Sequence, residues 1–566
     1  MLLCSCSIPA TKKWADSEVY RVLEKVRGRE HLEDRDFTID TTYSGRKPES
    51  LEPSEILNDR AVAASQKISI DEALTLAVEN SREFQARRER LYLTALTYTG
   101  VRHQFRPHLF GSSDASKSWL PQGTRGKGRG TSDTFAEVQT EAGATQTLLD
   151  GASLAVSFVN DILRYYTGDP RRKAFSTINF DLVQPLLRGA GRRIAAEKLT
   201  QSFRNVVYEV RDYTQYQAEF SRDVVVAYFR LLQSRDSVFN AFNDYRSRVK
   251  TTEYLRARSV DRENPLMARK AEQAELSSKN RYIDAIMRFR DSLDAYKLRL
   301  GIPISTKLRL DSTELDRLRK TGLVSLKVSQ KSAISLALEH RFPLINEIDQ
   351  FDDARRQLVV TADALKPGLT FVGNAALLSE KPLNFADFRF SDLQADVALQ
   401  LDLPVNRKLE RNAYRTALVR FEEEIRTLAL TMDTLRRDIE RNLRQLEQYS
   451  LNYGIQKQAV EEARLRVDGT QLKLEAGTAI LRDLEEAQDS LIAAQNAVTA
   501  ALVDHLEARL NLLVNIGILD WEKSRFWLSS NASKVEIPRA SSSDAASQGI
   551  MRDGEVIPPN ELFPDS

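Results

Sequence analysis

Apolar positions recur every three or four residues over long stretches of this chain. Between Leu418 and Tyr453 the spacing alternates between three and four without a slip, and one polar residue, Asn442, lies within the series. A mean repeat of about 3.5 residues is the pattern of a coiled-coil seam. We therefore predict one helix from about Arg407 to Lys473, roughly 100 Å long at 1.5 Å per residue. The seam consists of Leu418, Phe421, Ile425, Leu428, Met432, Leu435, Ile439, Asn442, Leu446, Tyr449 and Tyr453.

The first half of the chain has a matching charged stretch over about residues 191–259. A narrow seam buries one stripe of each helix, so each long helix needs neighbours. Returning helices over about residues 265–300 and 479–516 would supply them by forming antiparallel hairpins. We expect the turns at residues 261–265 (Asp-Arg-Glu-Asn-Pro) and 475–478 (Glu-Ala-Gly-Thr).

Two other regions alternate large apolar side chains with polar or small ones, most clearly at residues 177–182 and 396–403. A period of two residues is that of a strand with one apolar and one polar face. Such a sheet usually packs on a soluble core, but the neighbouring helices are too highly charged to cover it. We predict strands within residues 106–185 and about 367–404, with the glycine-rich residues 123–130 as a flexible loop.

The same arrangement occurs twice along the chain. Residues 68–80 and 328–340 each begin an amphipathic helix, and we expect the first helix to run from Ser69, its cap, to residue 104. In each half a strand region between two prolines follows, and then a long helical hairpin. The first strand region is longer, with 77 residues between its prolines against 36 in the second, and we attribute the surplus to a larger loop. An internal repeat of this kind predicts two similar units in one chain.

The predicted organisation therefore has five parts. Residues 67–303 form the first repeat and residues 325–520 the second. We expect a linker at residues 304–324, an irregular extension with a possible lipid anchor at residues 1–66, and a disordered tail at residues 521–566.

Composition excludes several classes of function. The 82 basic and 80 acidic residues nearly balance, and a net charge of +2 argues against a nucleic-acid surface. Five scattered histidines offer no metal-ligand spacing, and no phosphate-binding loop or nucleophile–base pair is apparent. We predict a protein that is not an enzyme and uses no cofactor or metal. No run of about 18 apolar residues is present, so we expect no transmembrane helix.

Both cysteines lie near the start of the chain. Leu3-Cys4-Ser5-Cys6 resembles the end of a bacterial lipoprotein signal, with Cys6 as the lipidated residue, although the basic and apolar segments of such a signal are missing. The alternative interpretation is two incidental free thiols.

Four sequence segments, in this order along the repeats, resemble the TolC-like outer-membrane efflux protein family. They are residues 71–77 (DEALTLA), 184–187 (QPLL), 225–232 (VVAYFRLL) and 475–478 (EAGT). The resemblance covers about residues 68–520. It implies a mainly helical protein with a small β part, in which each chain gives four strands to a trimeric, twelve-stranded outer-membrane β-barrel. The helical hairpins would form a hollow periplasmic cylinder.

The resemblance also assigns a site. Family members that have an acidic ring at the periplasmic tip place it after the Gly-Thr turn, here Gly477 and Thr478, and the matching acids are Asp483 and Glu486. Three residues apart on a helix, they share a face, and three copies would form a cation-attracting constriction. The alternative is ordinary solvated acids.

The two turns are also the expected contacts for an adaptor. In the first repeat this turn contains Asn264 and Pro265, where the family usually has glycine and an apolar residue, and Lys270 stands where an acid can occur. The first turn therefore departs from the family pattern at the expected adaptor contact, whereas Gly477 and Thr478 match it.

Together these features predict a passive exit duct in the bacterial outer membrane, part of a tripartite efflux or type I secretion system. The implied partners are two further copies of the chain, outer-membrane lipid, a periplasmic adaptor (membrane fusion) protein and an inner-membrane transporter of the RND, ABC or MFS type. The alternative function is a soluble or lipid-anchored periplasmic coiled-coil scaffold without channel activity.

Overall fold

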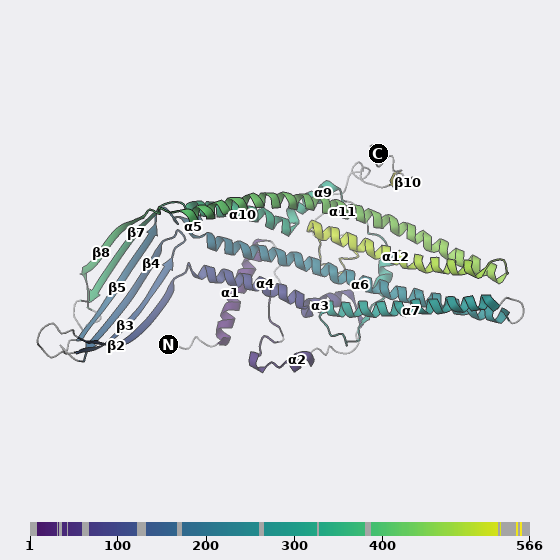
Figure 1. Cartoon of the computed structure of the whole chain (residues 1–566), viewed down its shortest axis with the longest axis horizontal. Coiled ribbons are helices and arrows are strands. Elements are labelled where there is room, and N and C mark those ends of the chain that lie inside the picture. Colours follow the sequence, from purple (N-terminus) through teal and green to yellow (C-terminus); the bar gives the residue numbers. More distant parts are fainter. Residues whose placement is uncertain are drawn as a thin grey trace. The chain divides into compact units, whose positions relative to one another are not determined.

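A computed structural model gives the fold of the chain (Figure 1). It describes residues 8–30, 32, 37–41, 43–58, 67–121, 132–166, 172–259, 265–324, 326, 328–379, 387–529, 533, 551–552 and 555–556.

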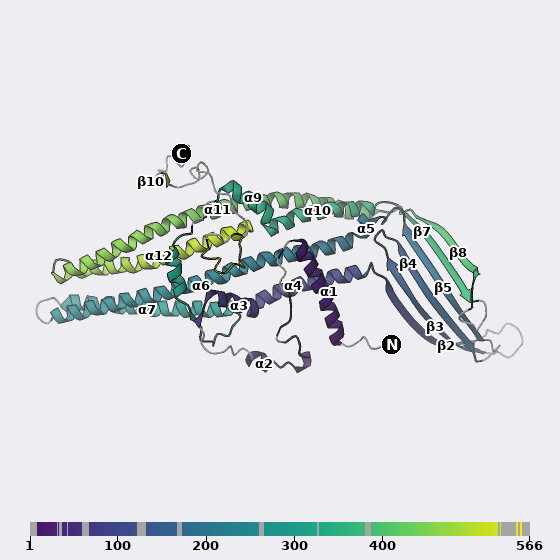
Figure 2. The ribbon, with the colours of Figure 1, turned by 180° about the vertical axis from the view of Figure 1, so that it is seen from behind.

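The helices come in matched pairs, one from each repeat, and the members of three of the four pairs have equal lengths. The pairs are α3 (Ile70–Asn80) and α9 (Gln330–His340), 11 residues each; α4 (Arg82–His103) and α10 (Phe342–Asp363), 22 each; α7 (Pro265–Leu300) and α12 (Leu481–Ile516), 36 each; and α6 (Glu197–Ser259) and α11 (Lys408–Glu475), with 63 and 68. The structure thus contains the duplication, long helices and hairpins that the sequence predicts, and Figures 1 and 2 show α11 and α12 lying side by side.

The single helix predicted over residues 69–104 is wrong, because the chain forms two helices there. Ser69 does cap α3, in a capping box with Glu72, but α3 ends at Asn80. Ser81 has an extended backbone, and its hydroxyl accepts a hydrogen bond from the amide of Phe84, which caps α4. The second repeat breaks at the equivalent place, between α9 and α10, where Pro343 at the start of α10 disfavours a continuous helix.

A glycine locks each of these breaks. Gly301 follows α7 and Gly517 follows α12, both with positive φ angles, of 74° and 86°. A Cβ atom on Gly301 would collide with the carbonyl oxygen of Asn80, and one on Gly517 would collide with that of His340. Only glycine allows this conformation and this approach together. The end of each returning helix therefore packs against the end of its short helix.

Six strands form one antiparallel sheet in the order β2-β3-β4-β5-β7-β8. Their bounds are β2 His108–Pro121, β3 Ser132–Thr147, β4 Ser153–Tyr165, β5 Arg172–Pro185, β7 Gly368–Ser379 and β8 Phe388–Asp402. The predicted count of four strands per chain is therefore wrong. Three such sheets would hold eighteen strands and not the predicted twelve, and the barrel itself stays a prediction.

The surplus of the first strand region forms strands and not only a loop. Residues 106–185 hold four strands, where the second region holds two. β3 escaped the sequence analysis because its apolar-face positions carry small residues such as Ala136, Ala142 and Ala144, which weaken the alternation. The glycine-rich residues 123–130 lie outside the described residues.

The two faces of the sheet differ in polarity, as the alternation predicts. One row of paired residues is apolar across all six strands: Leu109, Ala144, Val156, Phe180, Ala375 and Ala395. The adjacent row, on the opposite face, is mostly polar: His108, Thr145, Ala155, Asp181, Asn374 and Asp396. Large apolar side chains remain exposed, and Val397 on β8 is 72% exposed. No helix in the described part of the chain covers them.

The chain divides into two compact units, each built from both repeats. One comprises residues 1–37, 91–210 and 347–428, and the other comprises residues 38–90, 211–346 and 429–566. The predicted boundaries between repeats stay a prediction. The first unit holds the sheet, α1 (Ile8–Arg29), α5 (Arg192–Ala195), most of α10 and parts of α4, α6 and α11.

The extension was expected to be irregular, but residues 8–29 form helix α1. Val19, Leu23 and Val26 are buried, and the hydroxyl of Tyr92 on α4 donates a 2.7 Å hydrogen bond to Asp16. The apolar side of α1 is therefore covered within the first unit, which explains why this stretch forms a helix despite its weak periodicity.

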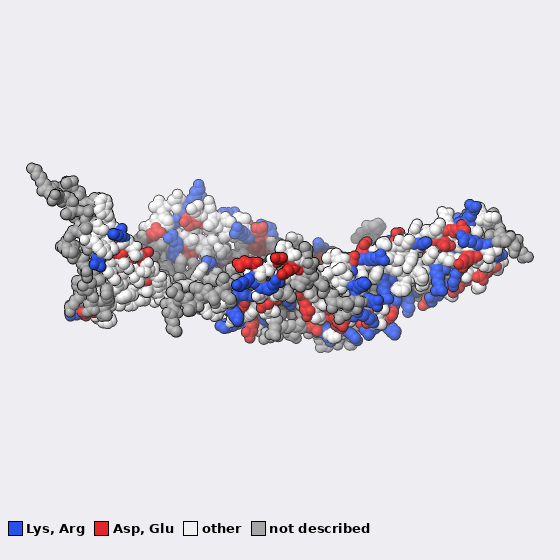
Figure 3. All heavy atoms as spheres, turned by 90° about the horizontal axis from the view of Figure 1, so that it is seen from below, with Lys and Arg blue, Asp and Glu red and all other residues white. Residues whose placement is uncertain are grey.

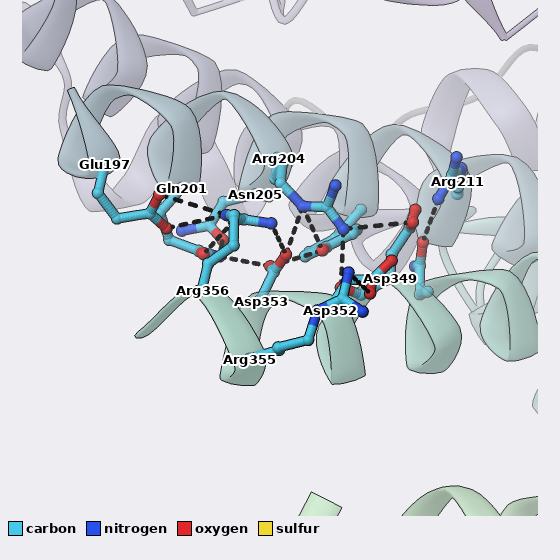
Figure 4. Close-up of polar contacts among 12 residues, drawn as sticks. Glu197, Gln201, Arg204, Asn205, Arg211, Asp349, Asp352, Asp353, Arg355 and Arg356 are labelled. Carbon is cyan, nitrogen blue, oxygen red and sulfur yellow. Dashed lines mark hydrogen bonds and ion pairs between the residues drawn. The ribbon is translucent and has the colours of Figure 1, made fainter. Parts of the chain in front are cut away.

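Charged side chains join α6 to α10 in the same unit (Figure 4). The Nε atom of Arg204 lies 2.5 Å from Asp353, and the Nε atom of Arg356 lies 3.1 Å from Glu197. Tyr208 donates a 2.6 Å hydrogen bond to Asp353, and burial, together with this bond, raises the pKa of the tyrosine. Ion pairs and hydrogen bonds therefore link α6 to α10.

In the second unit the last helix, α12, is the core element, with Leu506, Leu510 and Leu513 buried. The predicted linker at residues 304–324 is structured here. β6 (Arg309–Leu310) pairs in parallel with β1 (Lys67–Ile68), and α8 (Thr313–Thr321) follows. The unit also contains η1 (Pro48–Ser50), α2 (Pro53–Asn58), β9 (Met551–Arg552) and β10 (Glu555–Val556).

The start of the predicted disordered tail is also wrong. Phe526 and Trp527 are buried, and the guanidinium of Arg509 donates hydrogen bonds of 3.3 and 2.8 Å to their carbonyl oxygens. Two aromatic side chains and a buried arginine therefore fasten the chain directly after α12. Most of the remaining tail lies outside the described residues.

Acid is expected to destabilise the second unit through His505 on α12. Burial, with a contribution from the positive charge of Arg509, lowers the pKa of His505 to about 4 from 6.5. The unfolded state then binds the proton first, so stability is complete above pH 6.5 and is lost as the pH falls through about 4. The loss amounts to about 3 kcal/mol.

This prediction can be checked with thermal unfolding followed by circular dichroism over the same pH range. His505→Leu should remove most of the dependence, whereas His340→Leu, at a half-exposed position, serves as the matched control. Parallel pH profiles for the wild type and His505→Leu would contradict the assignment.

No helix in the described part of the chain combines the length and low charge needed to span a bilayer.

Candidate functional site at the ends of the helical hairpins

The turn of the second-repeat hairpin has the geometry of a helix C-cap. Gly477 follows α11 with a φ of 77°, and its amide donates a hydrogen bond to the carbonyl of Leu474. The amide and the hydroxyl of Thr478 both donate to the carbonyl of Lys473, at 2.9 and 3.1 Å. The predicted turn residues thus have a structural reason, since glycine accepts the left-handed conformation and threonine satisfies a free carbonyl.

Both predicted ring acids lie on the exposed surface of α12 next to this turn. Asp483 is in the first helical turn, where a negative charge suits the helix dipole. Glu486 lies 3.0 Å from the guanidinium of Arg466 on α11, and both side chains are at least half exposed. The structure therefore places the two acids on one accessible face, and their role as a ring stays a prediction.

Glu485 faces the protein instead. It is half-buried, and burial raises its pKa, while the charges of Arg248 and Lys270 oppose that rise and Asp489 adds to it. This acid is distinct from its neighbours in environment, as its position on the helix predicts.

A charged cluster that the sequence analysis missed lies deeper along the hairpins, and two of its four side chains are buried. Arg248 on α6 is 4% exposed, and its Nε atom donates hydrogen bonds of 3.0 and 3.2 Å to the two carboxylate oxygens of Asp244. Its Nη2 atom lies 2.6 Å from Asp489 on α12. Arg281 on α7 joins the same two acids, at 3.0 and 3.2 Å. The cluster holds α12 against α6 and α7.

Apolar contacts support the same arrangement. Leu481, at the start of α12, packs with Leu255 of α6 and Ala271 of α7. One turn further along, Leu484 and Ala487 pack on Val467 and Leu474 of α11, so the first turns of α12 contact both hairpins. Separating the hairpins at this end would break these contacts and the charged cluster.

Of the remaining predicted site residues, Asn264, Pro265 and Cys6, the structure describes only the proline. Pro265 is the first residue of α7 and is exposed, while Asn264 and Cys6 lie outside the described residues. Among the residues that the structure describes, no group of His, Cys, Asp or Glu is arranged to hold a metal ion. On the face in Figure 3, side chains of both charge signs are interspersed over the helices, with no large patch of one sign.

Solved structures that are similar to this chain include outer-membrane channels. The chain is similar to the CmeC channel of Campylobacter jejuni, with a TM-score of 0.58 and 12% identity over 79% of this chain and 85% of that one. It is also similar to the VceC outer-membrane protein of Vibrio cholerae, with a TM-score of 0.56 and 13% identity over 79% and 96% of the two chains.

The open state of the MtrE channel of Neisseria gonorrhoeae matches with a TM-score of 0.56 and 14% identity over 79% of this chain and 88% of that one. This chain has the fold of an outer-membrane channel. The predicted TolC-like fold class, mainly helical with a small β part, is therefore confirmed. No family model matches the sequence, and no curated protein matches it significantly.

Proposed function

We propose that the protein is a TolC-like outer-membrane efflux protein, which forms a passive exit duct in the bacterial outer membrane. It would receive substrates from a periplasmic adaptor and an inner-membrane transporter, in a tripartite efflux or type I secretion system. The channel fold supports this function, and a duct of this kind carries out no catalysis.

The observation that carries the proposal is the sheet with one apolar and one polar face. Rows of apolar residues cross all six strands on one face, and carboxylates such as Asp114, Glu141 and Asp161 lie on the other. A sheet of this kind needs lipid on one side and water on the other. Its edges must also be paired, because free backbone groups are costly in lipid. A homotrimer would supply that pairing.

Purification distinguishes this function from a soluble or lipid-anchored scaffold. We expect the protein to require detergent for extraction, to have the mass of a trimer in detergent, and to give conducting steps in planar bilayers. A stable monomer in detergent-free buffer would overturn the duct. A membrane-bound protein that conducts no ions would favour the lipid-anchored scaffold.

At the hairpin ends, we propose that Asp483 and Glu486 line a constriction and that Gly477 and Thr478 contact the adaptor. Asn264 and Pro265 would form the equivalent contact in the first repeat. The exposure of both acids beside the turn supports this assignment. Opening at this end would also have to separate α12 from α6 and α7, which the charged cluster around Arg248 opposes.

Neutralising both acids should reduce cation binding at the constriction. For Asp483→Asn with Glu486→Gln, we expect block by trivalent cations to weaken about tenfold or more, because the local counter-ion concentration falls with the charge. Single-channel recordings with added trivalent cation measure this effect. Glu485→Gln, which removes a carboxylate that faces the protein, is the matched control. Equal block in the wild type and the double variant would place the constriction elsewhere.

A further inference from the structure

The sheet of one chain ends in two long strands that have a partner on one side only. β2 pairs only with β3 and β8 only with β7 among the described residues. The two edge strands have nearly equal lengths, 14 and 15 residues. Two long exposed edges of this kind are ready templates for pairing with another chain.

The strands are displaced steadily along their own direction from β2 to β8. Starting at His108, the row of paired residues crosses the sheet and reaches Asp396 on β8. The last residue of β8, Asp402, lies six residues beyond Asp396. The helix-side ends of the strands are therefore offset by six residues over the five pairings from β2 to β8, or about one residue per strand.

An offset of about one residue per strand is close to that of a closed sheet whose shear equals its strand number, in which the strands tilt by about 36°. A flat, open sheet needs no such offset, whereas closure requires it. The sheet of one chain thus has the slant of a segment of a closed cylinder.

Directions and faces are also compatible with closure. Because all six strands alternate in direction, β2 and β8 run antiparallel to each other. If His108 of one copy lies opposite Asp402 of the next, the polar faces coincide, and Leu109 lies opposite Leu401 on the apolar face. A slip of one residue would place Leu401 opposite His108 and mix the two faces.

We propose that β8 of one copy pairs with β2 of a second copy, with His108 opposite Asp402, and that three copies close a sheet of eighteen strands. The number of copies rests on the proposed function, whereas the pairing and its register rest on the sheet itself. Eighteen strands at this tilt give a cylinder about 34 Å across, compared with about 23 Å for twelve. The duct would therefore have a wide outer mouth.

Disulfide cross-linking tests the register. The proposal places Ser112 of β2 directly opposite Ala398 of β8 in the next copy, both on the polar face. Ser112→Cys with Ala398→Cys should convert the monomer band into covalent dimers and trimers on a non-reducing gel after oxidation in detergent, because directly opposed residues lie within disulfide distance. Ser118→Cys with Ala398→Cys is the matched control, since it moves one cysteine six residues along the same face.

Three outcomes are distinguishable. Cross-linked trimers from the Ser112 pair and none from the control support the pairing. A detergent-extracted trimer in which Ala398→Cys links to no cysteine at position 110, 112 or 114 overturns the pairing of β8 with β2. A link to position 110 or 114 alone overturns the proposed register. Both outcomes leave the proposed function intact. A protein that is monomeric without detergent contradicts the proposed function itself.

Discussion

Val397→Arg is expected to prevent most of the protein from inserting in the outer membrane. Val397 lies near the middle of β8 on the apolar face and is 72% exposed. An arginine in the middle of a bilayer costs about 2–4 kcal/mol, and each assembly would carry three copies. The measurement is the amount of detergent-extracted trimer in the outer-membrane fraction.

Ala398→Arg is the matched control, because it places the same side chain one residue further along, on the polar face. We expect it to insert like the wild type. Equal insertion of both variants would show that the apolar face does not contact lipid, and would favour the scaffold.

Arg248→Met is expected to have the second large effect, a loss of stability at the hairpin ends. It leaves the buried Asp244 with Arg281 as its remaining partner, and removing one member of a buried ion pair costs about 3–5 kcal/mol. Because Arg281 still pairs with Asp244, we expect a loss at the lower end of this range, about 3 kcal/mol. Thermal unfolding in detergent measures it.

Two variants make this result specific. Arg248→Met combined with Asp244→Asn should recover much of the loss, because no uncompensated charge stays buried. Arg256→Met, which breaks the exposed pair with Glu272, should cost less than about 1 kcal/mol. If Arg248→Met unfolds like Arg256→Met, the cluster does not hold the hairpins together.

The long helices could be predicted from the sequence because their signals are local. The predicted helix over 407–473 compares with Lys408–Glu475, and the predicted return over 265–300 has the observed bounds. Proline and glycine mark the turns, and the seam repeats often enough to define its period. The sequence did not predict the break at Ser81, because serine occurs both within helices and at their caps. Here the close approach of Gly301 favours the cap.

The strand count could not be read with the same accuracy. β8 has large apolar residues at alternate positions, but β3 reaches the same face with Ala136, Val138 and Thr140. Its strand conformation comes from pairing with β2 and β4 on both sides, which a window of sequence does not contain.

The candidate site also has one part that the sequence predicts and one that it does not. The turn at Gly477 and the exposed acids beside it follow from residue types next to one another in the chain. The cluster around Arg248 joins side chains of three helices, and Asp489 lies 241 residues from Arg248. Such a cluster becomes visible only when the hairpins are folded together.

The glycine lock at the end of α12 has a mechanical consequence. With 36 residues, α12 is a rod about 54 Å long, whose far end begins at Leu481. If Gly517 acts as its pivot against α9, a rotation of about 5° moves that far end by about 5 Å. A displacement of this size is enough to part side chains across a narrow opening, while the contacts around the pivot itself barely change.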